Sequence, residues 1–317
     1  MGPYLTVRPQ RSATAGMGLV DFLLGIAFMA FLTVGLSVTP GANSGPEFWA
    51  ARTVFGLAAL SAAAAELRDQ DLLAQSVQPG EAVQIENVTE DRGVLVLSGP
   101  RARELLSVLT DADLGNEEFR WLTAREIRVA GIALRALRVS YVGELGWELH
   151  APLAALGELY DAIWTRGRAL GIANYGLYAL NSMRIEKGYK AWSMELTNEL
   201  NMLEADMSRF VGFNKAFVGQ AALAAQAPRF KIVYAEVAAT DTDARGGEPV
   251  LALDRCVGVT TSGAYGHRVS KSLVFACVEP QFAAPGSVFD VLLQGEPRRA
   301  TVLAQAAYDP GNLRMRV

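Results

Sequence analysis

The chain has 317 residues, enough for two domains, each with a core of its own. Its net charge of −4 argues against the basic surface that nucleic-acid-binding proteins carry, so no nucleic-acid partner is expected. The two cysteines argue against a disulfide framework and, with only two histidines, against a metal site. The low number of cysteines fits a reducing compartment. We therefore expect a cytoplasmic protein, or a protein of the mitochondrial matrix in a eukaryote.

The first 56 residues differ in composition from the remainder. Residues 22–39 form an uncharged, mostly apolar run, which is marginal for a membrane helix of roughly 20 residues. Arg8 and Arg11 precede this run, and Ala42-Asn43-Ser44 resembles a signal-peptide cleavage site. A misplaced or truncated gene start without a folded role is the third alternative. All three stay open, and membrane contact is expected only if the run is a real helix.

From residue 57 the hydrophobic pattern predicts a mixed α/β body. A helix over Ala62–Gln75 is followed by Pro79-Gly80, which breaks it. Strands are predicted at 83–85 and 94–97, and a further helix begins near Pro100. Its apolar face is predicted to contain Leu105, Leu106 and Leu109.

Alternating apolar residues on both sides of Ala130-Gly131 predict a β-hairpin. Its second arm is expected to continue as far as Tyr141. A helix from Pro152, with Leu153, Leu156, Tyr160, Ile163 and Trp164 at helical spacing, should end at Gly171. Another helix is predicted over Leu177–Lys187, before Gly188.

After residue 225 short strands recur at even spacing, separated by glycine and proline turns. This pattern is typical of a small antiparallel barrel of roughly 90 residues. The predicted strands cover 232–237, 250–253, 257–261, 273–278, 288–293 and 300–304.

The stretch from Arg138 to His150 contains the most unusual set of side chains. It has two carboxylates, Glu144 and Glu148, with two aromatic residues and two glycines. A carboxylate accepts two parallel N–H bonds from a planar ring, and aromatic faces stack on such a ring. The stretch is therefore either a cradle for a flat, hydrogen-bond-donating ligand or a bulged strand with its acids in solvent.

Several motifs in this chain resemble one known family. Tyr141-Val-Gly-Glu-Leu-Gly-Trp-Glu148 resembles the folate-binding signature of the aminomethyltransferases, which include the glycine cleavage T-protein. The segment 178–192 is most similar to the C-terminal half of the dimethylglycine and sarcosine dehydrogenases. In the barrel, 259–267 and Tyr308-Asp-Pro310 continue the resemblance, which covers about 57–317.

The resemblance implies an α+β fold with three subdomains in a ring around the pterin of tetrahydrofolate. It divides the chain into a non-family segment (1–56), a partial folate-binding domain (57–225) and a C-terminal β-barrel domain (226–317). It also implies transfer of a one-carbon unit from a methylamine, such as dimethylglycine or sarcosine, to tetrahydrofolate, forming methylenetetrahydrofolate.

The resemblance makes four residues candidates for contact with folate. Glu148 matches the glutamate that binds the pterin, and Tyr141 matches the tyrosine beside it. Glu144 has a weaker claim, since it is also placed to cap its own turn. Arg184 is either a contact for the folate tail or one half of a buried ion pair. Trp147, on the opposite side of the strand from Glu148, is expected in the core.

The catalytic aspartate of the family lies in the N-terminal subdomain, and no counterpart is found here. Residues 1–55 contain just two acids, Asp21 and Glu47, neither in a family-like context. The FAD-containing half of the dehydrogenases is also lacking, so a separate FAD-dependent oxidoreductase is an expected partner. Two alternatives follow: a folate-dependent transferase, or a catalytically impaired folate-binding module. No catalytic residue is assigned.

Overall fold

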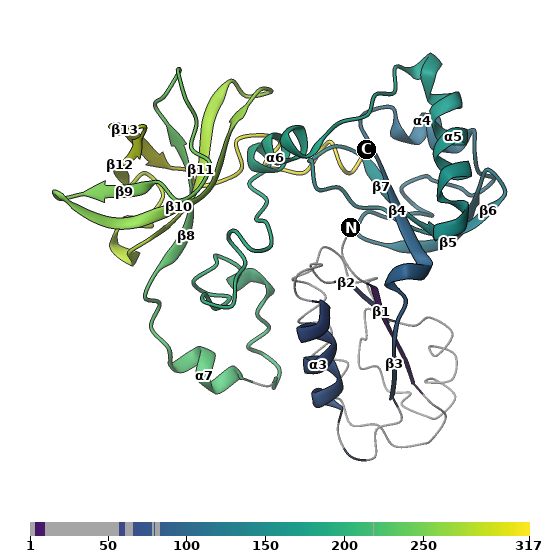
Figure 1. The fold of residues 1–317 in the computed structure, drawn as a ribbon, viewed down its shortest axis with the longest axis horizontal. Helices are drawn as coiled ribbons and strands as arrows, with labels where there is room; N and C mark the ends of the chain where they lie inside the picture. Colours follow the sequence, from purple (N-terminus) through teal and green to yellow (C-terminus); the bar gives the residue numbers. More distant parts are fainter. Residues whose placement is uncertain (1–3, 10–56, 61–65, 78, 80–82, 218) are drawn as a thin grey trace. The chain divides into compact units, whose positions relative to one another are not determined.

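The computed structural model describes residues 4–9, 57–60, 66–77, 79, 83–217 and 219–317 (Figure 1). These residues group into two compact units. Unit 1 comprises Met1–Ser140 and Leu145–Ile172, and unit 2 comprises Tyr141–Glu144 and Ala173–Val317. The apolar run 22–39, the possible cleavage site at 42–44, and both Asp21 and Glu47 lie outside the described residues.

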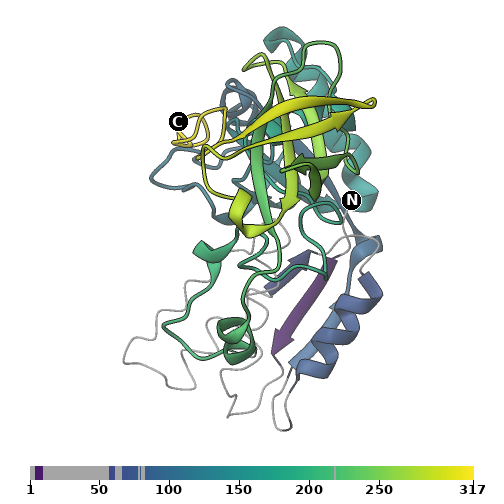
Figure 2. The same cartoon turned by 90° about the vertical axis from the view of Figure 1, so that its left-hand side faces the viewer.

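Unit 1 contains a small antiparallel sheet with the strand order β2-β1-β3. The central strand β1 (Tyr4–Pro9) pairs with β2 (Leu57–Leu60) and β3 (Val83–Asn87). Six residues of the N-terminal segment are therefore part of this sheet. Helix α3 (Glu66–Ser76) lies beside it in two perpendicular views (Figures 1 and 2). Among the described helices, none has the length and apolar character needed to cross a membrane.

The main sheet of unit 1 has four antiparallel strands in the order β4-β7-β6-β5. Their bounds are β4 Arg92–Ser98, β5 Ala124–Val129, β6 Ile132–Leu137 and β7 Gly146–Pro152. Strands β5 and β6 form the predicted hairpin, and the two turn residues Ala130 and Gly131 have φ values of 50° and 82°. This is the backbone conformation that two-residue hairpin turns require.

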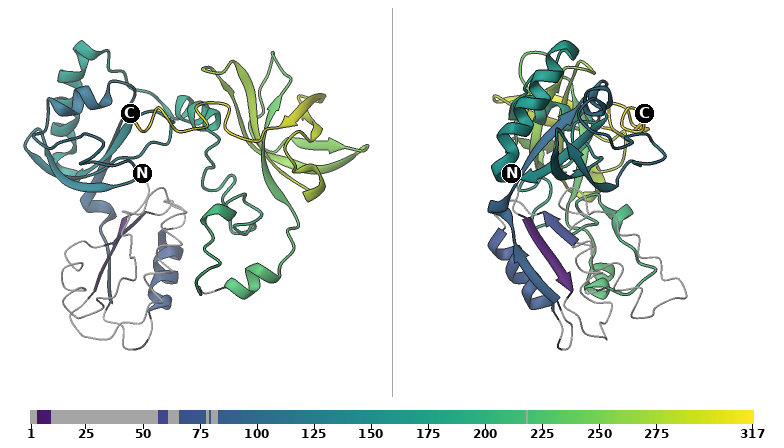
Figure 3. Two further views of the ribbon diagram at one scale, coloured as in Figure 1. Left: turned by 180° about the vertical axis from the view of Figure 1, so that it is seen from behind. Right: turned by 90° about the vertical axis from the view of Figure 1, so that its right-hand side faces the viewer.

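Helices α4 (Ala102–Ser107) and α5 (Leu156–Gly167) cover one face of this sheet (Figure 3). The predicted face of α4 is buried at Leu105 and Leu106, but Leu109 lies beyond the end of the helix. In α5 the buried residues are Leu159 and Ile163, whereas the predicted Leu153 and Tyr160 are exposed. Leu153 lies before the helix, in a 3-10 turn over Leu153–Ala155. Leu159 has the same i, i+3 and i+4 spacing to Leu156 and Ile163 as a buried face requires, and it takes the place predicted for Tyr160.

The second arm of the hairpin does not reach Tyr141. Strand β6 ends at Leu137, and the chain is irregular until β7 begins at Gly146. The prediction of a continuous strand is therefore wrong for residues 138–141. The physical reason is that Tyr141–Glu144 makes its contacts with unit 2 instead of with a neighbouring strand.

Unit 2 begins with helix α6 (Leu177–Glu186), which ends before Gly188, as predicted. An irregular segment with the 3-10 turn Ser208–Phe210 and helix α7 (Gln220–Ala225) leads to the barrel. The side chain of Ile185 on α6 packs with Ile232, Leu273 and Phe275 on the outer surface of the barrel. Ser182 Oγ adds a 2.7 Å hydrogen bond to the carbonyl of Tyr265.

The barrel is closed, and its strand order is β10-β11-β8-β13-β12-β9 (Figures 1 and 2). Alternate residues of each strand fill the interior, mainly with valine, alanine and leucine. The predicted α+β architecture with a small C-terminal antiparallel barrel is thus confirmed, although the strand at 257–261 is much longer than expected. The bounds are β8 Lys231–Val237, β9 Pro249–Ala252, β10 Arg255–Gly266, β11 Lys271–Val278, β12 Val288–Leu293 and β13 Glu296–Val302.

Candidate functional site

Strand β7 determines which way each side chain of the predicted folate-binding motif points. Side chains alternate along a strand, so Trp147 and Leu149 share one face and Glu148 and His150 the other. Trp147 and Leu149 are fully buried beneath α4 and α5. Glu148 therefore lies on the face of the main sheet opposite to these helices.

The cross-strand neighbours of Glu148 on this face are apolar. Across the sheet, Val96 on β4 and Leu137 on β6 are its direct partners. Val96 is 47% exposed, and the side chain of Glu148 is 16% exposed. Leu137 is buried. The carboxylate and the exposed Val96 together combine a hydrogen-bond acceptor with an apolar surface for a flat ring.

Trp147 is a core residue, as predicted. Its ring lies edge-on to Phe119, with the centroids 6.3 Å apart. The guanidinium groups of Arg103 and Arg138 each lie 5.8 Å from its ring centroid, which are cation–π contacts. Burial, with the positive charge of Arg103, lowers the pKa of Arg138 to about 10. These contacts fix β7 from its core side.

Tyr141 belongs to the loop between β6 and β7 and is held within unit 2. Its hydroxyl donates a 2.9 Å hydrogen bond to the carbonyl of Lys190. Its ring is parallel to that of Tyr189, with a centroid distance of 6.0 Å and an interplanar angle of 5°. Burial raises the pKa of Tyr141 to about 12, so the phenol remains a neutral donor at physiological pH.

Glu144 closes the same loop, but not by capping its own turn. Its carboxylate accepts a hydrogen bond from the hydroxyl of Tyr308, in the segment that follows the barrel. Lys187 packs behind the loop, where a Cβ at Gly143 would lie 2.8 Å from the Lys187 Cδ atom. Lys187 in turn forms a 3.3 Å ion pair with Asp309. The motif Tyr308-Asp-Pro310 therefore anchors the loop 141–144.

Arg184 lies in a buried ion pair, the structural alternative left open by its sequence. Its guanidinium donates to Glu195 at 3.0 Å, to the carbonyl of Tyr189 and to Asn181. Arg184 is 2% exposed and Glu195 is fully buried. Glu195 also accepts hydrogen bonds from Thr261 and Ser262 of β10, so the pair links α6 to the barrel.

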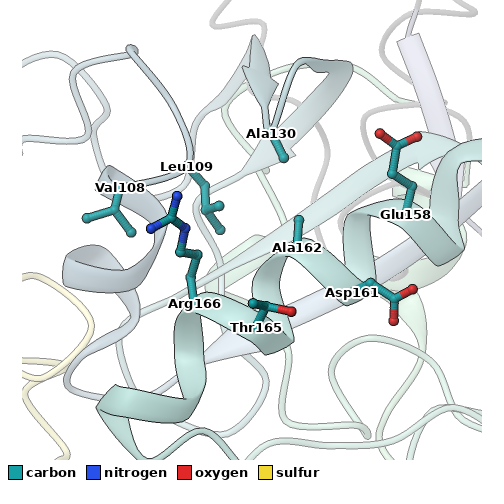
Figure 4. Close-up of a pocket in the computed structure, with 8 residues that line it drawn as sticks. All are labelled: Val108, Leu109, Ala130, Glu158, Asp161, Ala162, Thr165 and Arg166. Atoms are coloured by element: carbon teal, nitrogen blue, oxygen red, sulfur yellow. The ribbon is translucent and has the colours of Figure 1, made fainter.

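Two grooves on the described surface contain none of the predicted site residues. One, of about 780 Å³, is formed by the end of α4, the β5–β6 turn and helix α5, with Glu158, Asp161 and Arg166 on its rim (Figure 4). The other, of about 380 Å³, lies by the loop 239–243 of unit 2. Within the described ranges, no group of three or more His, Cys, Asp or Glu side chains is placed to bind a metal ion.

The sequence interpretation missed one residue of the site, His150. Its Nε2 atom lies 3.1 Å from Glu148 Oε2, and both side chains are largely buried. The sequence does contain a signal for His150: it lies two positions after Glu148, and residues two apart on a strand share a face. It was overlooked because the folate-binding signature 141–148 ends at Glu148.

Comparison with known proteins assigns the fold and the motifs to one family. Residues 56–215 match the GCVT N-terminal domain, and residues 231–309 match the glycine cleavage T-protein C-terminal barrel domain. The chain belongs to the folate-binding aminomethyltransferase family, which includes the glycine cleavage T-protein.

Both the dehydrogenases and the aminomethyltransferases occur among its relatives. Human mitochondrial dimethylglycine dehydrogenase is 38% identical over 73% of this chain, and mouse mitochondrial sarcosine dehydrogenase is 32% identical over 74%. The match covers 27% of each dehydrogenase. The aminomethyltransferase of Thermoanaerobacter sp. (strain X514) is 30% identical over 71% of this chain and 62% of its own length.

A solved structure shares the fold. The glycine cleavage system aminomethyltransferase T from Bartonella henselae superposes with a TM-score of 0.74 at 19% sequence identity. The superposition covers 97% of this chain and 84% of that structure.

Proposed function

We propose that this protein binds tetrahydrofolate and that Glu148 holds the pterin. The observation that carries the proposal is the position of the Glu148 carboxylate on the helix-free face of the main sheet. In the described part of the chain its one hydrogen-bond partner is His150 at Oε2, which leaves Oε1 available. The pterin ring offers neighbouring N–H donors and a flat apolar face, which match this acceptor and the adjacent Val96.

The other three predicted residues receive different roles. The Tyr141 hydroxyl is bonded to Lys190, so we propose that Tyr141 contributes through its ring. Glu144 and Arg184 have their charged groups bonded within unit 2, and we assign them to positioning the loop and helix α6. We do not assign a residue to the glutamate tail of the folate.

The reaction that we propose is one-carbon transfer from a methylamine, with dimethylglycine or sarcosine as candidate donors. The names of the dehydrogenase relatives support these donors. Tetrahydrofolate, when bound, supplies the nitrogen nucleophiles that take up the one-carbon unit. The match covers 27% of each of those dehydrogenases, and we propose that an FAD-dependent oxidoreductase oxidises the methylamine. The mitochondrial relatives support the matrix as the compartment if the source is a eukaryote.

A second candidate is a folate-binding module without turnover. It is favoured by the presence of just two acids, Asp21 and Glu47, among the first 55 residues, where the resemblance places the catalytic aspartate of the family. A positioned acid–base group typically contributes about 10²–10⁴ in rate. Without such a group, binding is expected to persist while the chemical step is slow.

Calorimetry of the full chain with tetrahydrofolate under anaerobic conditions tests the binding site. Glu148→Gln keeps the shape of the side chain but removes its charge, and a charged hydrogen bond contributes about 1.5–3 kcal/mol. We therefore expect the Kd to rise by about ten- to a hundred-fold. The matched control is Glu158→Gln on α5, on the other side of the sheet, which should leave the Kd unchanged. Equal affinities of Glu148→Gln and the wild type would contradict the assignment.

A separate assay distinguishes the two candidate functions. Formation of methylenetetrahydrofolate is measured with formaldehyde, and then with sarcosine or dimethylglycine plus a flavin-dependent oxidase. A rate above the uncatalysed background that falls in Glu148→Gln supports the transferase. Tight binding with a rate equal to the background supports the binding module.

A further inference from the structure

The imidazole of His150 is placed against the carboxylate that we assign to the pterin. The two residues lie two positions apart on β7, so their side chains project from the same face. His150 Nε2 is 3.1 Å from Glu148 Oε2, with 6% and 16% of the respective side chains exposed. A carboxylate only accepts hydrogen bonds, so the ring nitrogen that faces it, Nε2, carries the hydrogen.

Two residues lie directly across the sheet from His150. Opposite His150, strand β4 carries the apolar Val94 and strand β6 carries Arg135. The guanidinium of Arg135 is bonded to Glu126 on β5, with a distance of 2.7 Å from Nε to Oε1. Arg135, which faces the imidazole across the sheet, is thus paired with the carboxylate of Glu126.

We propose that His150 is a positioning residue that fixes the Glu148 carboxylate for the pterin, an inference that rests on the proposed function. A glutamate side chain has three rotatable bonds, and ordering them during binding weakens affinity. The hydrogen bond from His150 orders the carboxylate in advance. It occupies one lone pair of Oε2 and leaves Oε1 and the second lone pair of Oε2 for a ligand with two adjacent N–H donors.

A double-mutant cycle on tetrahydrofolate affinity tests this role in the full chain. His150→Leu removes the donor, and we expect the Kd to rise about ten-fold, equivalent to about 1.4 kcal/mol. His150→Gln places an amide N–H near the position of Nε2 and should stay within about three-fold of the wild type. In a Glu148→Gln background, His150→Leu should add less than a two-fold change, because its effect passes through the carboxylate. His267→Gln, in the β10–β11 turn, is the control for a histidine elsewhere.

Nuclear magnetic resonance provides a measurement that does not depend on the folding of the His150 variants. The chain has two histidines, so ¹⁵N-histidine labelling gives two sets of ring signals, assigned with His267→Gln. We expect a protonated Nε2 for His150 at neutral pH and a shift of its signal on adding tetrahydrofolate. The shift should be absent in Glu148→Gln.

The outcomes separate this inference from the function on which it rests. Wild-type binding with an unchanged Kd in His150→Leu, or an equal loss in both backgrounds, overturns the positioning role alone. An unprotonated Nε2 overturns it as well. Absence of any binding by the wild type overturns the proposed function and the inference together.

Discussion

Arg184 carries a positive charge inside the protein. The carboxylate of Glu195, 3.0 Å away, balances that charge. Removing one partner of such a pair leaves the other charge buried, which costs about 3–5 kcal/mol. We therefore expect Arg184→Met to lower the free energy of unfolding by about that amount, because Glu195 is fully buried. Urea unfolding followed by circular dichroism measures the loss.

The matched control is an ion pair on the barrel surface. Lys271 and Glu236, on β11 and β8, are 41% and 36% exposed, and exposed pairs contribute at most about 1 kcal/mol. Lys271→Met should therefore have a small effect. If Arg184→Met were as mild as Lys271→Met, the buried pair would not hold α6 to the barrel.

At the scale of single elements, the β5–β6 hairpin contains local strain. Ala130 adopts a φ of 50°, a left-handed conformation that costs a residue with a Cβ roughly 1–2 kcal/mol. Glycine is free of that steric cost although it loses more entropy on folding. Ala130→Gly should therefore stabilise the protein by about 1 kcal/mol, measured as a shift in the urea midpoint.

A substitution within the adjacent strand provides the comparison. Ala133 lies exposed on β6 in the same hairpin, where its backbone is extended. Ala133→Gly should destabilise the protein by about 0.5–1 kcal/mol. Destabilisation by both changes would show that Ala130 is not strained in solution.

Elements that depend on a pattern of neighbouring residues were predictable from the sequence. The barrel strands and the hairpin follow from alternation over a few residues, and the strand position of Glu148 follows from the same rule. The loop 141–144 was not predictable, because its partners lie 49 residues away at Lys190 and 164 residues away at Tyr308. For the same reason the helical pattern placed Arg184 but could not identify Glu195 as its partner.

At the scale of the whole molecule, the buried carboxylates of the described residues lie in unit 2, at Glu186, Glu195 and Glu204, and Glu248 and Asp309 of the same unit are partly buried. Burial by itself would raise the pKa of Glu204, but N–H groups of Asn201 and Arg229 outweigh it and hold the pKa below 4.5. Bonds from Thr260, Arg245 and Gly246 likewise hold the pKa of Glu248 below its usual value. The pKa of Asp309 is lowered, against the effect of burial, by the N–H groups of Leu313 and Arg314 and by Lys187.

These shifts predict that acid destabilises unit 2. A carboxyl whose folded pKa is depressed contributes stability above its unfolded pKa, and that stability is lost as the pH falls through the folded value. Stability should therefore decline below about pH 4.5. Pepsin at pH 3 should cleave within 173–317 before it cleaves within 83–140. Glu248→Gln should lower stability more at pH 7 than at pH 3; equal losses at both pH values would contradict the assignment.

The loop Tyr141–Glu144 affects how this polypeptide can be divided. The chain leaves unit 1 after Ser140, contributes four residues to unit 2 and returns at Leu145, whereas the remainder of unit 2 begins at Ala173. No single break in the backbone can therefore yield both units intact. Genes split at residue 172 would encode an N-terminal fragment that carries Tyr141 and Glu144, and a C-terminal fragment that carries Lys190 and Tyr308. Co-expression of the two fragments, rather than expression of either one, is the arrangement that supplies every residue of unit 2.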